Sequence, residues 1–553
     1  MAKIRAFIFR RHDILILTVV AISVLLPYLF VHKIYNQDDF LFHKNRLLMF
    51  YQAVATHFDF HPMVFGTMAR GYGYAADLFY PSLWTLPFVI FYYFGFGFIA
   101  SYYGLLLVYV MATALISYYC ALSFFKKRQQ ALFAAVLYTT SSYYAIDLFV
   151  RGALGEAMVY SFVPLFFLGF YRLVTDQKYG VFITGIALGI IANIHFLSVY
   201  MIVGIVIIFN LLLLVQKKYS LRFLYRQTAA YMLAVALSAS VILPIMEQMM
   251  DSGYQFMGED RMAPQGLSYS LGSLISNSFS NSAGVWQNLA PNVGPILVIT
   301  LIYAGLHFGR MVVRTRQLFL IASSFFVLSS NLLFWSFADK TPLAKIQFEW
   351  RLLTFATLFT VLLLTVLAGK TKYQVGLMVL SVLLTVTFNF KTLANFQNMG
   401  IHATTDQQFS SYGNEIIGGG EEFVPNGINY DKPPKHFQTR QVAAGKTTII
   451  PTEIGDTIYQ AYHFPQTTTV IFPKYYYDGY RVTLSSGQRA KVFSHQGYVA
   501  ARIPKGQGTY LLTYKKTALQ RFSILLASFA WLLAAVAAIL LIARHRIFKS
   551  SRN

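Results

Sequence analysis

The sequence predicts a polytopic α-helical membrane protein that carries a separate β-domain near its C-terminus. Of its 553 residues, 56% are hydrophobic and only 12% are charged, which is far from the composition of a soluble globular domain. Several apolar runs reach the ~20 residues that an α-helix needs to cross a bilayer. One long polar stretch, 390–518, interrupts these runs and has the turn residues and short β-branched segments of a β-domain.

The basic residues indicate which ends of the spans lie inside the cell. The formal net charge is +23, and the Lys and Arg residues gather in short loops between apolar runs. This is the positive-inside pattern of a cytoplasmic face that meets anionic lipid, so it argues against a nucleic-acid partner. The one cysteine, Cys120, lies inside an apolar run, which excludes an internal disulfide and a thiolate metal site.

The second apolar region decides the topology. After a first span at about 14–31, residues 32–99 form a first outer loop rich in charged and aromatic residues. Residues 82–124 could hold two spans, but the basic triplet Lys126-Lys127-Arg128 would then face outward. We therefore expect an interfacial or re-entrant helix at 82–94, followed by one span at about 100–124.

With that choice, the later basic loops all fall inside. The remaining spans are expected at about 130–149, 157–174, 180–195, 197–215, 228–247, 293–309, 317–337, 351–369, 374–389 and 519–543. The total is about twelve spans with both termini in the cytoplasm. The expected domains are a transmembrane catalytic domain, 1–389, an outer β-domain, 390–518, and a final span with a basic cytoplasmic tail, 519–553.

The outer β-domain is expected to be mostly antiparallel and β-sandwich-like. Turn residues such as Asp478-Gly479 separate runs with the alternation or β-branching of strands. These runs are 447–450, 467–472, 481–484, 498–503 and 508–514.

The first outer loop begins with a cluster of ionisable residues. Asp38, Asp39, His43 and Arg46 lie within one short stretch directly after the first span. In a helix, Asp39, His43 and Arg46 stand at i, i+4 and i+7 and share one face. The alternative is a solvated loop whose charges only mark the edge of the membrane.

Further polar residues belong to the same outer face. They are Arg70, Arg151, Glu156, Lys340, Gln347, Glu349 and Arg351. An ionisable group at the centre of a membrane helix costs roughly 2.5–3.5 kcal/mol on insertion scales, so such groups tend to face a cavity. For each one taken alone, a structural ion pair is the alternative to a role in binding. His195 alone reads as a satisfied polar residue, and the sequence has no nucleotide-binding, HExxH or GxSxG motif.

Several motifs together resemble a known family. The pattern Asp39…His43…Arg46 is similar to that of the GT-C superfamily of polyprenyl-phosphate-sugar-dependent glycosyltransferases. The segments 72–74 and 79–83 belong to the same similarity. Three further segments, 346–353, 421–425 and 472–480, narrow the resemblance to the YfhO-like bacterial membrane proteins, and it extends over nearly the whole chain. Two positions depart from the family pattern, with Glu349 in place of a proline and Tyr480 in place of a tryptophan.

The resemblance implies an inverting glycosyltransferase in the bacterial plasma membrane. Its donor would be a sugar on a polyprenyl (undecaprenyl) phosphate, and its acceptor an envelope polymer such as teichoic acid, or a glycolipid. The active site and the β-domain would face outside. No cofactor is expected, although the adjacent pair Asp38-Asp39 would permit a divalent metal.

The resemblance also implies roles for the site residues. Asp39 would be the general base, with Asp38 as the second choice because helix register decides which of the two points inward. The carrier phosphate would be held by basic residues: Arg151, Lys340, Arg351 and Arg46. Glu156 and Gln347 would hold sugar hydroxyls or orient the base. The other residues expected to contact the substrate are His43, Arg70 and Glu349.

Two other functions fit parts of the sequence. A transporter or flippase of lipid-linked glycans would share the span count and the basic inner loops, but its polar residues should lie near mid-membrane rather than on one face. A membrane anchor that presents the β-domain as a binding module would leave the first-loop cluster without a role.

Overall fold

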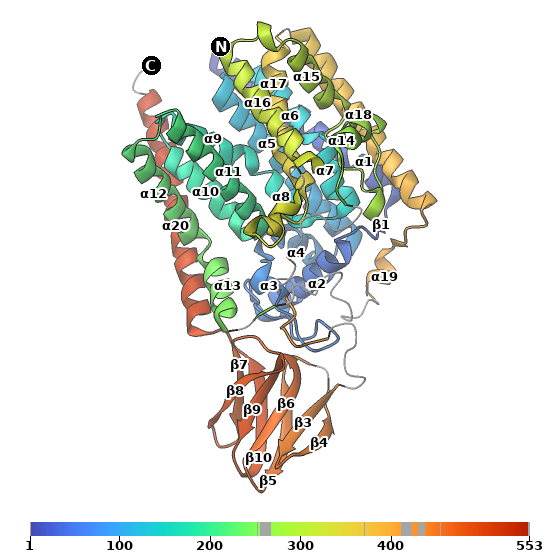
Figure 1. Ribbon diagram of the computed structural model, residues 1–553, viewed down its shortest axis with the longest axis vertical. Coiled ribbons are helices and arrows are strands. Elements are labelled where there is room, and N and C mark those ends of the chain that lie inside the picture. Colours follow the sequence, from blue (N-terminus) through green and yellow to red (C-terminus); the bar gives the residue numbers. More distant parts are fainter. Residues whose placement is uncertain are drawn as a thin grey trace.

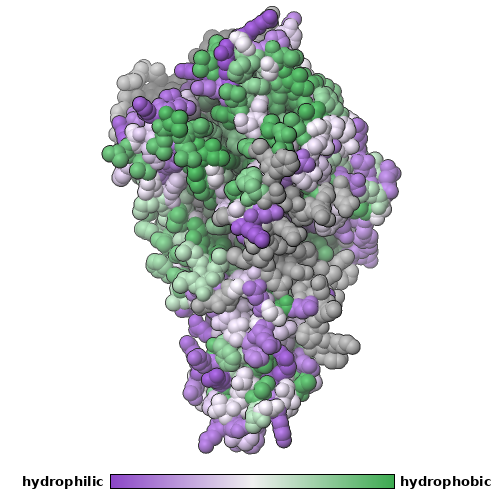
Figure 2. Space-filling model, viewed as in Figure 1, coloured by the Kyte–Doolittle hydropathy of each residue, from purple (hydrophilic) through white to green (hydrophobic). Residues whose placement is uncertain are grey.

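The computed structural model describes residues 2–251, 253–254, 267–333, 335–369, 371–410, 423–429, 437–453 and 455–550. The helices form one bundle, the β-domain lies at one end of it, and both chain termini lie at the other end (Figure 1). Hydrophobic residues gather on the visible face of the bundle, whereas the β-domain and the opposite end of the molecule are more hydrophilic (Figure 2).

Several helices are suited to cross a membrane. By length and composition six of those described could do so, and eight could if each of two bent helix pairs is one span. The six lie in α1 (Ala2–Val31), α5 (Phe98–Phe125), α11 (Phe196–Val215), η9 with α17 (Glu349–Leu352 and Leu353–Leu367), α18 (Thr371–Asn398) and α20 (Ala518–Ser550). The bent pairs are α8 with α9 (Leu154–Tyr160 and Val163–Val174, 45°) and α12 with α13 (Leu221–Leu237 and Ala239–Asp251, 78°). These helices indicate a membrane protein.

The other expected spans are shorter helices. They are α10 (Gly180–Ile194), α15 (Pro295–Leu306) and α16 (Val313–Leu328). The expected span 130–149 is broken into α6 (Arg128–Thr139), α7 (Ser142–Ile146) and a π-helical turn, η2 (Asp147–Arg151). Ser141 explains the break, because its backbone is extended and its hydroxyl accepts a hydrogen bond from the N–H of Tyr144 as the N-cap of α7.

At the sharp bend between α12 and α13, side chains form hydrogen bonds with a backbone carbonyl. A bend frees backbone carbonyls that would otherwise bond within the helix. The carbonyl of Leu237 accepts hydrogen bonds from Asn193 Nδ2 at 3.0 Å and from Trp531 Nε1 at 2.9 Å. The expected straight span 228–247 is therefore two half-helices whose junction is fixed by α10 and α20.

The first outer loop contains helices that lie between the bundle and the β-domain (Figure 1). They are α2 (Phe40–His57), α3 (Ala76–Phe79), η1 (Leu83–Thr85) and α4 (Leu86–Tyr93). The short helix expected at 82–94 is present as η1 and α4. The 8 residues of α4 extend only about 12 Å, too short to cross a bilayer. The remaining short helices are α14 (Leu271–Ser280), α19 (Asp406–Ser410), η4 (Trp286–Asn288), η5 (Phe308–Arg310), η6 (Asn331–Leu333), η7 (Trp335–Ala338) and η8 (Pro342–Ile346).

The β-domain is one eight-stranded antiparallel sheet in the order β4-β3-β6-β9-β8-β7-β10-β5. The five expected strands are β4 (Lys446–Pro451), β6 (Thr468–Tyr475), β7 (Tyr480–Leu484), β9 (Tyr498–Ile503) and β10 (Gly506–Tyr514). Three more were not expected: β3 (Gln438–Ala443), β5 (Ile458–Phe464) and β8 (Arg489–His495). The rings of Phe472 on β6 and Tyr510 on β10 lie 5.6 Å apart although three strands separate β6 from β10 in the sheet. The single sheet therefore curves into a half-barrel and is not the β-sandwich expected from the sequence.

The β-domain is joined to the first outer loop by buried contacts. Lys474 has no exposed surface, and its Nζ donates to the carbonyls of Gly66, Gly71 and Gly455 at 2.5–2.8 Å. The N–H of Tyr475 donates to the carbonyl of Tyr72 at 2.8 Å, and the two rings stack at 5.3 Å. A second link is the two-stranded ladder of β1 (Ile34–Tyr35) and β2 (Ala403–Thr404). The helix α18 continues to Asn398, so the first residues of the polar stretch 390–518 are helical.

Candidate functional site

The site is built around the start of α2 and the loop that ends η2. Asp39 is the residue directly before α2, and its carbonyl accepts the hydrogen bond of the His43 N–H at 3.2 Å. The backbone N–H of Asp39 donates to the carbonyl of Arg151 at 2.8 Å. The helix start is thus attached to a loop more than one hundred residues away, and the side chains of Asp39 and Arg151 are held side by side.

The π-helical turn determines where Arg151 lies. It brings Asp147 and Arg151 together as neighbours at i and i+4, and both are buried. Gly152 closes the turn at a φ of +62°, and a Cβ there would lie 2.4 Å from Gln37 Oε1. Gln37 Nε2 donates to the carbonyl of Phe149 at 2.8 Å. Glycine at 152 therefore lets the first loop approach closely. π-Turns of this kind are frequent at functional sites.

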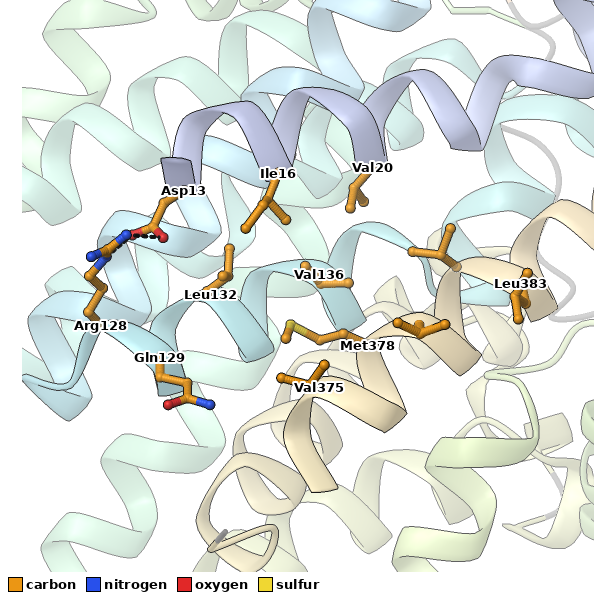
Figure 3. A pocket seen from close by; sticks show the side chains of 12 residues that line it. Asp13, Ile16, Val20, Arg128, Gln129, Leu132, Val136, Val375, Met378 and Leu383 are labelled. Atoms are coloured by element: carbon orange, nitrogen blue, oxygen red, sulfur yellow. Dashed lines mark hydrogen bonds and ion pairs between the residues drawn. The ribbon is translucent and has the colours of Figure 1, made fainter. Parts of the chain in front are cut away.

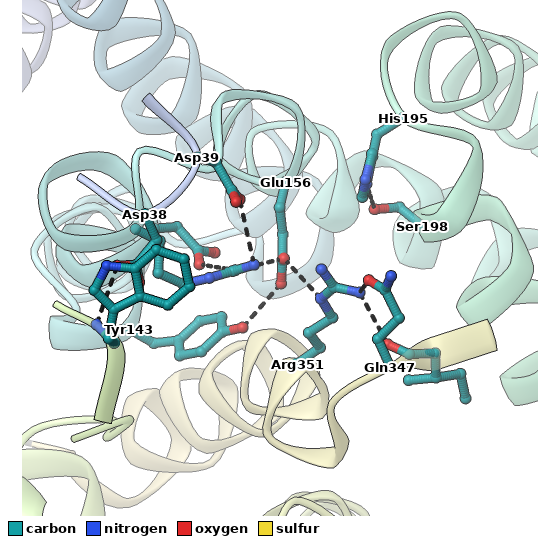
Figure 4. Close-up of polar contacts among 12 residues, drawn as sticks. Asp38, Asp39, Tyr143, Glu156, His195, Ser198, Gln347 and Arg351 are labelled. Atoms are coloured by element: carbon teal, nitrogen blue, oxygen red, sulfur yellow. Dashed lines mark hydrogen bonds and ion pairs between the residues drawn. The ribbon is translucent and has the colours of Figure 1, made fainter. Parts of the chain in front are cut away.

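Arg151 is the centre of a buried ion-pair network (Figure 4). Its Nη1 lies 2.7 Å from Asp147 Oδ1 and 2.6 Å from Glu156 Oε2, and its Nη2 lies 3.9 Å from Asp39 Oδ2. Glu156 also accepts a hydrogen bond from the Tyr143 hydroxyl at 2.9 Å. Arg351 joins from the opposite side, with Nε 3.2 Å from Glu156 Oε2. Glu156 therefore bridges the two arginines.

Arg351 is held by the segment that precedes α17. Its Nη1 donates to Gln347 Oε1 at 2.7 Å and to the carbonyl of Ile346 at 2.9 Å. Its guanidinium also lies 5.1 Å from the ring of Phe348. The neighbouring Trp350 packs its ring 4.7 Å from the guanidinium of Arg151. One short segment thus fixes both arginines.

Asp39 is the accessible carboxylate of this network. Of the three acids paired with Arg151, the side chains of Asp147 and Glu156 are 0% and 4% exposed, whereas that of Asp39 is 47% exposed. Surrounding protein raises the pKa of Asp39, while Arg151 and Arg351 act in the opposite direction. Asp39 can therefore contact a ligand while a fixed guanidinium holds it.

The adjacent Asp38 points elsewhere. Its Oδ1 accepts a hydrogen bond from the backbone N–H of Trp286 at 3.0 Å. Burial raises the pKa of Asp38 to about 7, although the Trp286 hydrogen bond lowers it. The two neighbouring carboxylates have separate partners, and the one on the arginine network is Asp39 (Figure 4).

A second layer of aromatic and basic residues lies beside the network. The guanidinium of Arg46 lies 4.1 Å from the ring of Tyr80, and its Nη1 donates to the Tyr80 carbonyl at 3.1 Å. The rings of His43 and His195 lie 5.5 Å and 5.4 Å from Tyr80. Burial and the charge of Arg46 hold the pKa of His43 well below its usual value. Two of the expected residues, His43 and Arg46, thus meet on one ring.

Tyr80 also contacts the loop that carries Glu156. A Cβ at Gly155 would lie 1.7 Å from the Tyr80 hydroxyl, so only glycine leaves room for this ring. His195 is held in turn, because its Nδ1 lies 2.8 Å from Ser198 Oγ (Figure 4). The second layer therefore reaches the network at Gly155.

Three of the expected site residues lie apart from the network. Arg70 is exposed, and its backbone φ is +59°. It lies on the side of the β-domain, where burial raises the pKa of Tyr72 and the charge of Arg70 acts to lower it. Lys340 is exposed and takes no part in the ion pairs of the described residues. Glu349 is buried, but its Oε1 accepts a hydrogen bond from the Ser268 hydroxyl at 2.5 Å. Of the motif 421–425, Glu421 and Glu422 lie outside the described residues, while Phe423 stacks on Phe79 at 4.7 Å.

Four residues of the site were not predicted from the sequence. They are Asp147, Tyr143, Tyr80 and His195. Asp147 carried a usable signal, since it is an acid in an otherwise apolar run, four residues before Arg151. Tyr143 carried none, because nothing distinguishes it from the chain's many other buried aromatic side chains. Tyr80 lies in the motif 79–83 and His195 was interpreted as a satisfied polar residue, but no sequence pattern predicts that these two side chains meet.

Comparison with known proteins gives no assignment, because no protein-family model and no curated protein matches the chain. Within the described residues, no group of three or more His, Cys, Asp or Glu side chains could hold a metal ion. The possible divalent metal beside Asp38 and Asp39 stays a prediction.

Proposed function

We propose that the chain is an inverting membrane glycosyltransferase that moves a sugar from a polyprenyl phosphate to an acceptor outside the cell. The observation that carries this proposal is the half-exposed carboxylate of Asp39 on the buried network of Arg151, Glu156 and Arg351. A general base needs an accessible carboxylate in a fixed position. A phosphate leaving group needs fixed positive charge in a site of low dielectric constant.

The proposed setting is a plasma membrane crossed twelve times. The broken and short helices then count as spans alongside the six to eight that are long and apolar enough. The chain termini lie at the end of the bundle opposite the β-domain (Figure 1), and basic loops such as Lys126-Lys127-Arg128 follow the positive-inside rule at that end. Asp39 and the β-domain then face outside.

The proposed reaction is a single displacement at the anomeric carbon. The acceptor hydroxyl attacks this carbon from the side opposite the carrier, and its proton passes to the carboxylate of Asp39. The bond from the anomeric carbon to the phosphate oxygen breaks, and the phosphate leaves with the electron pair. Because polyprenyl phosphate is a good leaving group, one carboxylate acting as base is enough.

The two arginines have different parts in this proposal. Two buried acids already engage Nη1 of Arg151, so Arg151 orients Asp39. Arg351 has one ion-pair partner among the described residues, Glu156, and its Nη1 bonds to neutral oxygens. More of its positive potential is therefore left for the carrier phosphate. In this proposal, Gln347, which holds Arg351, and Tyr80 contact the sugar.

The test is a turnover assay on purified protein in lipid with a panel of undecaprenyl-phosphate sugars, with and without a chelator. The readout is sugar release, or transfer to a crude acceptor from the cell envelope such as teichoic acid or glycolipid. Turnover of one donor supports the proposal. Intact donors together with movement of labelled lipid between the leaflets of liposomes would overturn it in favour of a flippase.

A further inference from the structure

A large groove lies away from the candidate site, between helices α1, α6 and α18. Its volume is about 770 Å³, within the ~300–1,000 Å³ typical of ligand sites. Nine of its twelve lining residues are aliphatic or Met: Ile16, Val20, Leu132, Val136, Val375, Met378, Val379, Val382 and Leu383. Figure 3 shows these side chains pointing between the three helices. The chemistry of this wall fits a hydrocarbon chain.

One end of the groove is polar. Asp13 and Arg128 form a two-point ion pair there, in which Arg128 Nη2 donates to Asp13 Oδ1 at 2.6 Å and Nε donates to Oδ2 (Figure 3). The Tyr118 hydroxyl also donates to Asp13 Oδ2, at 2.6 Å. Gln129 completes this end, and the Thr371 hydroxyl donates to Gln129 Oε1 at 3.1 Å. The start of α18 therefore lies at the same polar end.

The polar end carries an excess of positive charge. Lys126 and Lys127 directly precede Arg128, Lys372 directly follows Thr371, and all three lysines are exposed. Of the charged residues described at this end, four are cations, namely the three lysines and Arg128, and Asp13 is an acid. A basic pocket between transmembrane helices on the cytoplasmic side is the arrangement that recognises anionic lipid headgroups.

The depth of the groove fits one leaflet. Asp13 lies 18 residues before Val31, the outer end of α1, which corresponds to about 27 Å of helix and nearly the thickness of the hydrocarbon core. The polar end is therefore at one membrane interface when the Asp39 site is at the other. From Arg128 to Val136 the groove follows α6 for about 12 Å, close to half of the core.

We infer that this groove binds one anionic phospholipid of the cytoplasmic leaflet. The headgroup phosphate lies among Lys126, Lys127 and Lys372, and an acyl chain lies along Val136, Met378 and Val379. Asp13 neutralises Arg128, so the three exposed lysines supply the selectivity for charge. The inference rests on the membrane orientation proposed above and not on sugar transfer, so it can fail while glycosyl transfer holds, or hold while glycosyl transfer fails.

The test is native mass spectrometry of the full-length protein in detergent, titrated with phosphatidylglycerol or phosphatidylcholine. The wild type should retain one phosphatidylglycerol at a concentration at least tenfold lower than it requires for phosphatidylcholine. The variant K126Q/K127Q/K372Q should bind both lipids equally, and Met378→Trp, which fills the groove, should retain neither. The matched control K217Q/K218Q/R222Q removes three exposed cations from another inner loop and should keep the preference.

Equal binding of both lipids by the wild type would overturn the inference. So would a preference that survives in the triple lysine variant or disappears in the control. Retention of phosphatidylglycerol by Met378→Trp would place the lipid outside the groove. A dimer of the wild type that Met378→Trp dissociates, without any lipid preference, would show that a second copy of the chain occupies the groove.

Discussion

Asp39 and Arg151 are joined twice, once through their backbones and once through their side chains. The N–H of Asp39 donates to the carbonyl of Arg151 at 2.8 Å, and Asp39 Oδ2 lies 3.9 Å from Arg151 Nη2. The backbone bond fixes the start of α2 against the π-helical turn, so the carboxylate cannot move far from the guanidinium. The pair is therefore a rigid element, with its open side at Asp39.

Of the acids in the network, Glu156 is the one whose substitution should lower the free energy of unfolding most. It accepts from Arg151, Arg351 and Tyr143 while 4% exposed, so Glu156→Gln leaves two buried guanidinium groups without their shared partner. Loss of one member of a buried ion pair costs about 3–5 kcal/mol, and we expect a loss of this size in unfolding experiments in detergent. The control Arg222→Gln breaks an exposed pair with Asp176 and should cost less than about 1 kcal/mol. Equal effects of the two variants would contradict the network.

Gly155 should tolerate no side chain. In Gly155→Ala the new Cβ meets the Tyr80 hydroxyl at 1.7 Å, so Tyr80 must leave its place beside Arg46 and His195. We expect a loss of both thermal stability and turnover. Gly204→Ala is the matched control, because a Cβ there has no described atom within 4 Å, and alanine in a helix is favoured by up to about 1 kcal/mol. An unchanged Tm and activity for Gly155→Ala would show that Tyr80 is not fixed there.

The pH dependence of stability should report on Asp77. Burial raises its pKa from 3.8 to about 7, against the effect of its hydrogen bond from Ser82 N–H at 2.6 Å. Between pH 4 and 7 the folded protein therefore holds a proton that the unfolded chain has released, so stability falls as the pH rises through this window. Asp77→Asn removes this titration. The difference in Tm between Asp77→Asn and the wild type should therefore become more favourable to the variant from pH 5 to pH 8. A difference that stays constant over this range would contradict the raised pKa of Asp77.

Lys474 should fasten the β-domain to the first outer loop. Its buried ammonium donates to carbonyls of Gly66 and Gly71 in that loop and of Gly455 in the domain. Lys474→Met leaves these carbonyls without their donor, and we expect faster hydrogen exchange in segment 66–74. Lys516→Gln, which breaks the more exposed ion pair with Asp59, is the control and should change exchange in this segment little. Unchanged protection in Lys474→Met would show that other contacts hold the domain.

The sequence was informative where a pattern is local. Most of the α-helical segments follow from runs of apolar residues. The sequence left the stretch around Asp39, His43 and Arg46 open between a helix and a solvated loop, and the structure has the helix α2 there. Five of the eight strands have β-branched or alternating residues. In β5 the middle inward positions are Gln460 and Tyr462, which are only partly buried, and in β8 no residue is fully buried. The hydrophobic pattern of both strands is therefore weak.

The site depended on relationships that no local pattern contains. Arg151, Glu156 and Arg351 could each be named from the sequence because ionisable groups are rare in apolar segments. Their mutual pairing, and the choice between Asp38 and Asp39, depend on the π-helical turn and on the Trp286 N–H that engages Asp38. The breaks at Ser141 and Leu237 likewise come from side-chain hydrogen bonds and not from a loss of hydrophobicity.

The central claim is that Asp39 is the general base, and comparison with its neighbour tests it most directly. Asp39→Asn keeps the size of the side chain but cannot accept the proton, whereas Asp38→Asn changes a carboxylate directed at Trp286. With an undecaprenyl-phosphate sugar that the wild type turns over, both variants are assayed in lipid after their folding has been checked by Tm. We predict that Asp39→Asn loses about 10²–10⁴-fold in turnover while Asp38→Asn stays within a few-fold of wild type. A folded Asp39→Asn protein with wild-type turnover would contradict the account.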